Sequence, residues 1–199
     1  MPAERPAQAA GVAAPAGEVV VRSLEQLRAK YGDPKDATYG RLRIPALDID
    51  APIGVRTVAK NAELPDPTGP TDVVWYDFSG WPGFGGAPGK GGNAVFAGHV
   101  DRAAFLEYAG VRYVGPGIFF SLDRLEEEDT IEVAVGGSTL RYAVVWVSAV
   151  RAAGANWGEL LSANLGADAI TLITCGGTFD AERHEYSHRL VVRAVRRTG

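Results

Sequence analysis

The sequence predicts a mainly β fold, a closed or nearly closed barrel of mixed strands with short peripheral helices. Short apolar runs that alternate with polar or small residues recur along most of the chain, as in half-buried strands. Helical patterns are few and brief, and 25 glycines among 199 residues indicate many turns. This length suits one domain with a sizeable core plus a tail. Many short strands with few helices favour the barrel.

Three segments are expected along the chain. Residues 1–18 are rich in Ala, Pro and Gly without apolar periodicity, so we expect a flexible leader or linker. A helical extension at 19–37 and a main domain at 38–199 follow. The leader lacks the basic start and apolar core of a signal peptide, and no run of about 18 apolar residues encodes a membrane span. Either the protein is cytosolic, or a membrane anchor has been removed from it.

Local patterns predict the elements in order. Ser23 and Gln26 fit a capping box and Gly32 can end a helix, which predicts a helix at 23–31. The stretch 62–93 is a long Gly-, Pro- and Asp-rich loop around a short apolar run at 73–76, which is typical of a functional surface. Strands are predicted from about residue 39 to 53 and at 93–98, 130–135, 139–150, 169–174 and 188–195, with a hairpin turn at Gly136–Gly137. Short helices are predicted at 102–109, 120–126 and 157–164, the last capped by Asn156.

Charge and motif spacing argue against several functions. The net charge of −4 gives no broad electrostatic reason to bind nucleic acid or an anionic membrane. The glycines of 83–91 have neither the dinucleotide nor the P-loop spacing. His184 and His188 lie four apart without an HExxH pattern, so no metal ligand set is predicted. The acidic cluster at 123–129 reads as a solvated helix end, with a calcium site as the alternative.

The only cysteine, Cys175, is the candidate nucleophile. It follows the apolar strand Thr171–Thr174, where a thiol can project into a cleft, and the adjoining Gly176 lets a substrate backbone approach closely. A thiol with a pKa near ~8.5 is mostly protonated at neutral pH and needs a nearby base or cation. The alternative is a buried structural cysteine.

His99 and Arg189 are the candidates to assist this thiol. His99 ends a second apolar strand, and two strand ends from distant segments can converge at one barrel mouth. Acyl transfer also needs a fixed donor where negative charge develops on the attacked carbonyl oxygen. Arg189 opens the last strand and can supply this donor while it stabilises a thiolate. Arg183, in the preceding loop, is the second candidate.

These residues resemble those of sortases. Thr171-Leu172-Ile173-Thr174-Cys175 is similar to the TLxTC signature of that family, and the order His99, Cys175, Arg189 matches the family's order. Two further stretches resemble the actinobacterial class F group, with class E the next nearest: Gly98-His99-Val100-Asp101 and Cys175-Gly176-Gly177-Thr178-Phe179-Asp180. The similarity spans roughly residues 38–197. Arg102–Val114 is longer than class F leads us to expect, as is the loop before Arg189.

The resemblance implies the sortase eight-stranded β-barrel and a cysteine transpeptidase without a cofactor. Cys175 would cleave an LPxTG-like sorting signal between Thr and Gly through a thioacyl-enzyme intermediate. His99 would protonate the departing amine and deprotonate the incoming one, and Arg189 would steady the substrate and the oxyanion. The amine acceptor would be a cell-wall precursor or a pilin lysine. The enzyme would be a monomer at the extracellular face of the membrane of a Gram-positive bacterium.

Four residues are expected to bind the substrate: Thr174 and Gly176 beside the nucleophile, and Trp75 and Tyr76 in an aromatic groove. Two rival interpretations remain at this point. One is a different cysteine acyl-transferase or peptidase, such as an L,D-transpeptidase, although the SHGC-type motif of that family is absent. The other is a non-catalytic β-barrel binding module in which Cys175 is structural.

Overall fold

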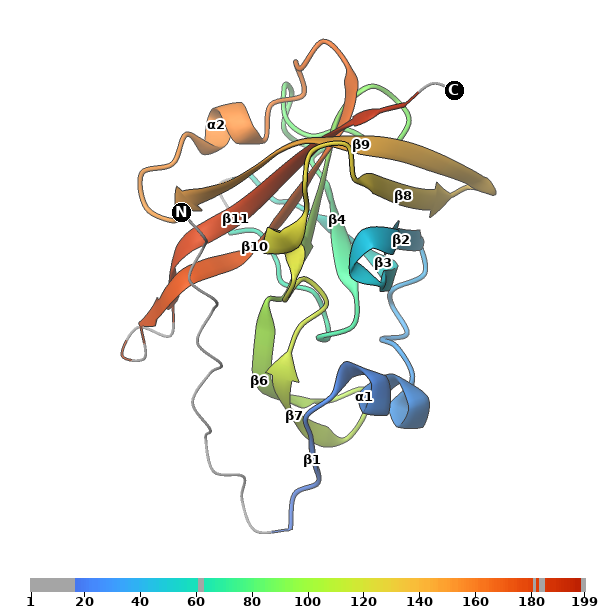
Figure 1. Cartoon of the computed structure of the whole chain (residues 1–199), viewed down its shortest axis with the longest axis vertical. Coiled ribbons are helices and arrows are strands. Elements are labelled where there is room, and N and C mark those ends of the chain that lie inside the picture. The colour runs from blue at the N-terminus through green and yellow to red at the C-terminus, as the bar shows by residue number, and fades with distance from the viewer. Residues whose placement is uncertain (1–16, 61–62, 181, 183–184, 198–199) are drawn as a thin grey trace.

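Eight strands close into one barrel in the computed structural model, which describes residues 17–60, 63–180, 182 and 185–197. Around the barrel the order is β10-β11-β9-β8-β2-β3-β4-β5 (Figure 1). Within the barrel, the β3–β4 and β5–β10 pairs are parallel, and the other described pairs are antiparallel. The predicted mixed, eight-stranded barrel is therefore confirmed.

The elements follow the predicted strand pattern closely. The barrel strands are β2 (Gly40–Ile44), β3 (Ile49–Thr57), β4 (Val73–Asp77), β5 (Gly92–Gly98), β8 (Thr130–Val135), β9 (Ser138–Arg151), β10 (Asp168–Asp180) and β11 (Glu185–Arg196). A smaller sheet holds β1 (Val20–Val21), β6 (Asp101–Leu106) and β7 (Val111–Pro116). The helices are α1 (Leu24–Tyr31) and α2 (Trp157–Leu160), with 3₁₀ turns η1 (Pro45–Leu47) and η2 (Leu122–Arg124).

Side-chain alternation along the strands builds two apolar layers. On β10, Leu172 joins the large cluster inside the barrel, together with Phe96 of β5. The next residue, Ile173, lies on the opposite face and joins a second cluster outside the barrel with Val95. Successive strand residues point to opposite faces, so one pair of neighbouring strands feeds both clusters. The outer cluster forms the floor of the cavity described below.

Helix α1 begins and ends where the sequence predicts. The Ser23 hydroxyl accepts a hydrogen bond from the Gln26 amide at 3.4 Å, and Gly32, at φ +75°, caps the other end. Leu27 is fully buried in a third apolar cluster that includes Tyr113 of β7. The small sheet and α1 therefore form one packed unit, which lies at the lower end of the molecule in Figure 1.

The predicted helix at 102–109 is wrong, because most of this segment forms strand β6. Ala103 and Ala104 are good helix formers, but β6 pairs with β7 along its whole length. Leu106 is buried against the third cluster, so tertiary packing overrides local propensity. The other two predicted helices are present but shorter: 120–126 contains only η2, and 157–164 contains α2, which Asn156 caps as predicted.

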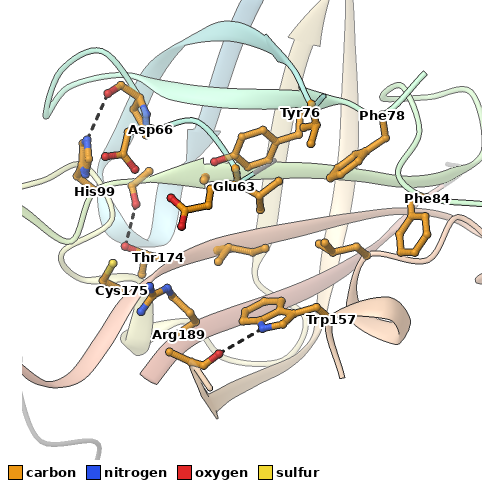
Figure 2. Close-up of a pocket in the computed structure, with 18 of the residues that line it drawn as sticks. Glu63, Asp66, Tyr76, Phe78, Phe84, His99, Trp157, Thr174, Cys175 and Arg189 are labelled. Atoms are coloured by element: carbon orange, nitrogen blue, oxygen red, sulfur yellow. Dashed lines mark hydrogen bonds between the residues drawn. The ribbon is translucent and has the colours of Figure 1, made fainter. Parts of the chain in front are cut away.

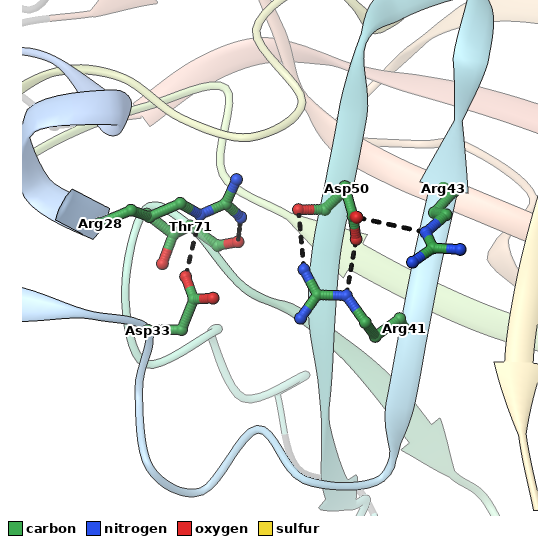
Figure 3. A network of polar contacts seen from close by, with 6 residues as sticks. All are labelled: Arg28, Asp33, Arg41, Arg43, Asp50 and Thr71. Atoms are coloured by element: carbon green, nitrogen blue, oxygen red, sulfur yellow. Dashed lines mark hydrogen bonds and ion pairs between the residues drawn. The ribbon is translucent and has the colours of Figure 1, made fainter.

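Two polar networks brace this framework (Figure 3). Arg28 of α1 donates to Asp33 at 2.9 Å and to the Thr71 carbonyl at 2.7 Å, which ties the helix to the segment before β4. Asp50 accepts from both Arg41 and Arg43 across the β2–β3 pair. The ion pairs of Asp50 are exposed, and exposed ion pairs add little stability. The Arg28 network matters more for function, because it anchors the segment before β4, part of which borders the cavity.

Candidate functional site

The β10–β11 register brings Cys175 and Arg189 together. The two residues are direct partners across this antiparallel pair. Directly opposite residues on neighbouring strands project from the same face, so the thiol and the guanidinium share one side of the sheet. Figure 2 shows the Arg189 side chain directed toward Cys175. The pairing depends on the regular ladder from Ala169 to Gly176, which the bulge between Gly176 and Phe179 leaves intact.

His99 reaches the same place from the other neighbour of β10. The parallel β5–β10 ladder ends at the pair Ala97 and Ile173. One step further, the buried Thr174 hydroxyl donates to the Gly98 carbonyl at 2.8 Å and extends the connection by a side chain. Cys175 directly follows Thr174, His99 directly follows Gly98, and both side chains line the same cavity.

Close packing explains the glycine before His99. A Cβ on Gly98 would lie 2.6 Å from the Phe119 ring, so only glycine fits there. Beyond it, the Phe119 amide donates to the His99 carbonyl at 3.0 Å. The backbone at His99 is therefore fixed on both sides, which limits where its ring can lie.

The His99 ring meets a carbonyl and a cation at one nitrogen. Its Nε2 lies 3.3 Å from the Pro67 carbonyl oxygen and 3.3 Å from Arg102 Nη1. Burial, followed by the charge of Arg102, lowers the pKa of His99 to about 4, whereas Asp66 and the Pro67 carbonyl act in the opposite direction. The imidazole is therefore neutral at physiological pH.

Cys175 is half-buried and rests as a thiol. Burial raises the pKa of the thiol, Arg189 lowers it, and the carboxylates of Asp66 and Asp101 raise it again. Arg189 is itself held in place, because its Nη1 donates to the carbonyls of Tyr186 and His188, both at 3.1 Å. Its fixed charge is thus available to any negative charge that develops at the sulfur.

The three side chains border a cavity of about 850 Å³. Its walls are mainly apolar and aromatic, and its floor is the outer cluster on β4, β5 and β10. Figure 2 shows Tyr76, Phe78, Phe84 and Trp157 along the cavity beyond the sulfur. The described residues that line it are Val58, Glu63, Leu64, Asp66, Pro67, Tyr76, Phe78, Trp81, Phe84, Ala97, Gly98, His99, Ala152, Trp157, Gly158, Leu161, Ile173, Thr174, Cys175, Glu185 and Arg189.

A comparison with protein families now identifies the family to which this fold belongs. The family described as the sortase domain matches residues 42–197, which is most of the chain. The chain belongs to the sortase family. The protein is therefore an enzyme, a transpeptidase of the sortase kind.

Solved sortases of several kinds share the fold. Sortase A from Corynebacterium diphtheriae is 26% identical, with a TM-score of 0.56 over 88% of this chain and 67% of that one. Sortase C-1 from Actinomyces oris is 22% identical, with a TM-score of 0.53 over 89% and 84%. The sortase D5 transpeptidase from Clostridium perfringens is 17% identical, with a TM-score of 0.55 over 88% and 89%. No curated protein sequence matches this sortase.

The structure gathers most of the residues that the sequence singled out, with one clear exception. Thr174 and Tyr76 line the cavity, but the Thr174 hydroxyl is already donated to Gly98, and that of Tyr76 to the Pro65 carbonyl. Gly176 adjoins Cys175 in the ladder. Trp75 does not line the cavity: it points the other way along β4 and stacks on Tyr39, with ring centroids 4.9 Å apart.

Other expectations fall outside the site or outside the described residues. Arg183 and His184 are not among the residues that the structure describes, and neither is most of the predicted leader at 1–18. In the acidic cluster, Asp129 accepts from the Glu126 amide. Across the described ranges, no group of three or more His, Cys, Asp or Glu side chains is arranged to hold a metal ion. Within those ranges too, every helix is too short or too polar to cross a bilayer.

Sequence reasoning missed two charged neighbours of the site, Asp66 and Arg102. Asp66 lies in the long loop that was expected to be functional, but no spacing rule links it to His99. Arg102 lies three residues after His99, in the segment predicted to be helical. A strand directs side chains differently from a helix, so the wrong element hid the contact between Arg102 and His99.

Proposed function

We propose that this sortase cleaves an LPxTG-like sorting signal between Thr and Gly, forms a thioacyl-enzyme at Cys175, and transfers the acyl group to an amine. The observation that supports this most is the position of Cys175, directly opposite Arg189 and beside the strand end that carries His99. A nucleophile, a proton carrier and a fixed cation are the groups that acyl transfer requires.

The first half of the reaction starts from a neutral pair. The Cys175 proton moves to His99, and the thiolate attacks the carbonyl carbon of the Thr residue. Negative charge then develops on the carbonyl oxygen, where the guanidinium of Arg189 stabilises it. When the tetrahedral intermediate collapses, the C–N bond breaks, the Gly amine leaves with the proton from His99, and a thioester remains on Cys175.

In the second half, His99 accepts a proton from the incoming amine as that amine attacks the thioester. The tetrahedral intermediate again places its charge near Arg189. Its collapse breaks the C–S bond and leaves the new amide, and the sulfur takes back the proton from His99. Because Cys175 and His99 exchange one proton, only a small fraction of the enzyme needs to be in the thiolate–imidazolium form at a given moment. Water is the slower competitor for the thioester.

The apolar cavity suits the residues that precede the scissile bond. Apolar and aromatic walls with a few polar groups are typical of a site that binds an apolar ligand segment. Tyr76, Phe78 and Trp157 are proposed to contact the Leu and Pro side chains of the signal. Thr174 and Gly176 are proposed to border the scissile bond. The proposed chemistry uses only protein side chains and requires no cofactor.

The class and the cellular setting are also proposals. The class F assignment, with class E as the alternative, rests on Gly98-His99-Val100-Asp101 and on the residues after Cys175. The solved relatives carry the names of sortases A, C and D, so the fold does not decide between classes. We propose that the enzyme acts as a monomer at the outer surface of a Gram-positive actinobacterium, on a cell-wall precursor or a pilin lysine.

A peptide panel tests the reaction. Pentapeptide signals of the LPxTG type, varied at each position in turn, are incubated with the enzyme and an amine acceptor, and the products are followed by mass spectrometry. The proposal predicts a new amide at Thr, lost in both Cys175→Ala and His99→Ala. Turnover that survives in Cys175→Ala would overturn it.

A further inference from the structure

Arg102 occupies an unusual position for a cation, against the ring of the proposed proton carrier. Its Nη1 lies 3.3 Å from His99 Nε2 and 3.6 Å from an Asp66 carboxylate oxygen. Its Nε is buried without a hydrogen-bond partner. A buried, unpaired guanidinium nitrogen is costly, so a guanidinium kept there points to a role beyond stability.

A rigid element holds Arg102 in this place. It lies at the start of β6, opposite Gly115 of β7, in the segment that is longer than expected for class F. The hairpin of β6 and β7 is extended by β1, and its buried side chains pack against α1. The extra segment therefore does more than lengthen a loop, because it fixes a positive charge beside His99.

The contacts at Nε2 constrain the state of the ring. A neutral imidazole nitrogen can donate to the Pro67 carbonyl or accept from Arg102, but it cannot do both. A protonated ring suits Pro67 and meets repulsion from Arg102. Asp66 offsets part of this repulsion, but its side chain is 74% exposed and its charge is screened by solvent.

Several other charged or titratable groups lie around the cavity. They come from the segment before β4, from β4 itself, and from β6, β10 and β11: Glu63, Asp66, Tyr76, Asp101, Cys175, Glu185 and Arg189. Among the charges that act on His99, Arg102 has the largest influence and Asp66 opposes it.

We propose that Arg102 is a positioning residue for His99, which opposes protonation of the ring and extends toward acid the pH range in which the Cys175–His99 pair is active. Asp66 moderates this effect from the opposite side. The consequence for turnover rests on the proposed function, whereas the consequence for the ring itself does not.

The His99 ring can be followed directly, because the chain has only three histidines. NMR titration of the ring is carried out on the wild type, Arg102→Met, Arg102→Lys and Asp66→Asn. Arg112→Met is the matched control, since Arg112 lies on the neighbouring strand β7 and pairs with Glu18 instead. Removal of the Arg102 charge should raise the midpoint of His99 by about one pH unit. Arg102→Lys and Arg112→Met should leave it nearly unchanged.

Asp66→Asn should shift the His99 midpoint in the opposite direction, and its exposed position means that the substitution should not disturb folding. It should lower the His99 midpoint, because it removes a carboxylate charge that favours the imidazolium. An unchanged midpoint in Arg102→Met, or a higher midpoint in Asp66→Asn, overturns the proposal.

The pH profile of kcat/KM then connects the ring to the reaction. Its acid limb should move to higher pH in Arg102→Met together with the NMR midpoint. If the His99 titration midpoint moves in Arg102→Met but the acid limb of the kcat/KM profile does not, the role of Arg102 in the reaction is refuted. If the wild type turns over no sorting peptide, the proposed function fails, but the titration still tests the contact between Arg102 and His99.

Discussion

The hydrogen bond from Thr174 to the Gly98 carbonyl joins the two strand ends that carry Cys175 and His99, and Thr174→Val removes it. Valine has nearly the same shape and the β-branch that strands favour. The hydroxyl is lost, and the buried carbonyl loses a donor at 2.8 Å. Such a loss costs about 1–3 kcal/mol of the free energy of unfolding. The strand ends are also freed to separate, and small misplacements of reacting groups can lower kcat by up to about a hundredfold.

Thr171→Val is the matched control for this prediction. It is the same chemical change on the same strand, and it removes a buried hydrogen bond of 2.6 Å to Asn93. Urea denaturation should show a comparable loss of stability in both variants. Peptide turnover should show a loss of kcat in Thr174→Val alone. Equal losses of kcat in both variants, or no change in either property of Thr174→Val, would refute the reasoning.

Three further predictions concern Arg189, Arg193 and Asp72. Arg189→Met should lower kcat/KM by about 10²–10³, the effect of losing an oxyanion donor. It should also slow iodoacetamide alkylation of the thiol, because the pKa of Cys175 rises. A kcat/KM within the wild-type range would exclude Arg189 as the oxyanion donor. Arg193 donates to the Leu160 carbonyl at 2.8 Å beneath α2, so Arg193→Met should loosen the Trp157 wall and raise KM with little change in kcat, as steady-state kinetics can measure. Burial raises the pKa of Asp72 to about 6, above its ordinary value, so its contribution to stability is complete at low pH and is lost as pH rises through about 6. Asp72→Asn should therefore gain stability relative to the wild type between about pH 4 and pH 7 in urea titrations, and a constant difference would contradict this.

The strand ends that carry Cys175 and His99 could be predicted because each is an apolar run that stops at a reactive residue. Their convergence follows once β10 pairs with β5 and β11, and the pairing opposite Arg189 follows from the register of that ladder. Nothing in the residue pattern fixed this register, but the antiparallel hairpin of β10 and β11 made it a natural outcome.

Other parts of the site could not be derived from local patterns. Trp75 and Tyr76 are adjacent on β4, so only one of them can face the cavity, and composition does not decide which. Ala103 and Ala104 favour a helix locally, and only pairing with β7 makes β6 a strand. The position of Asp66 depends on the loop around it, which is held by long-range contacts. Tyr76 contacts the Pro65 carbonyl, and His99 contacts the Pro67 carbonyl.

The most direct test of the central claim is to capture the acyl-enzyme by intact-protein mass spectrometry. A sorting peptide is added without an amine acceptor, the reaction is quenched in acid, and the modified residue is located by digestion. The proposed mechanism predicts an adduct with the mass of the peptide up to Thr, attached at Cys175, together with release of the fragment that begins with Gly. Cleavage of the peptide with no adduct on Cys175, at any time from the first turnover onward, would contradict it.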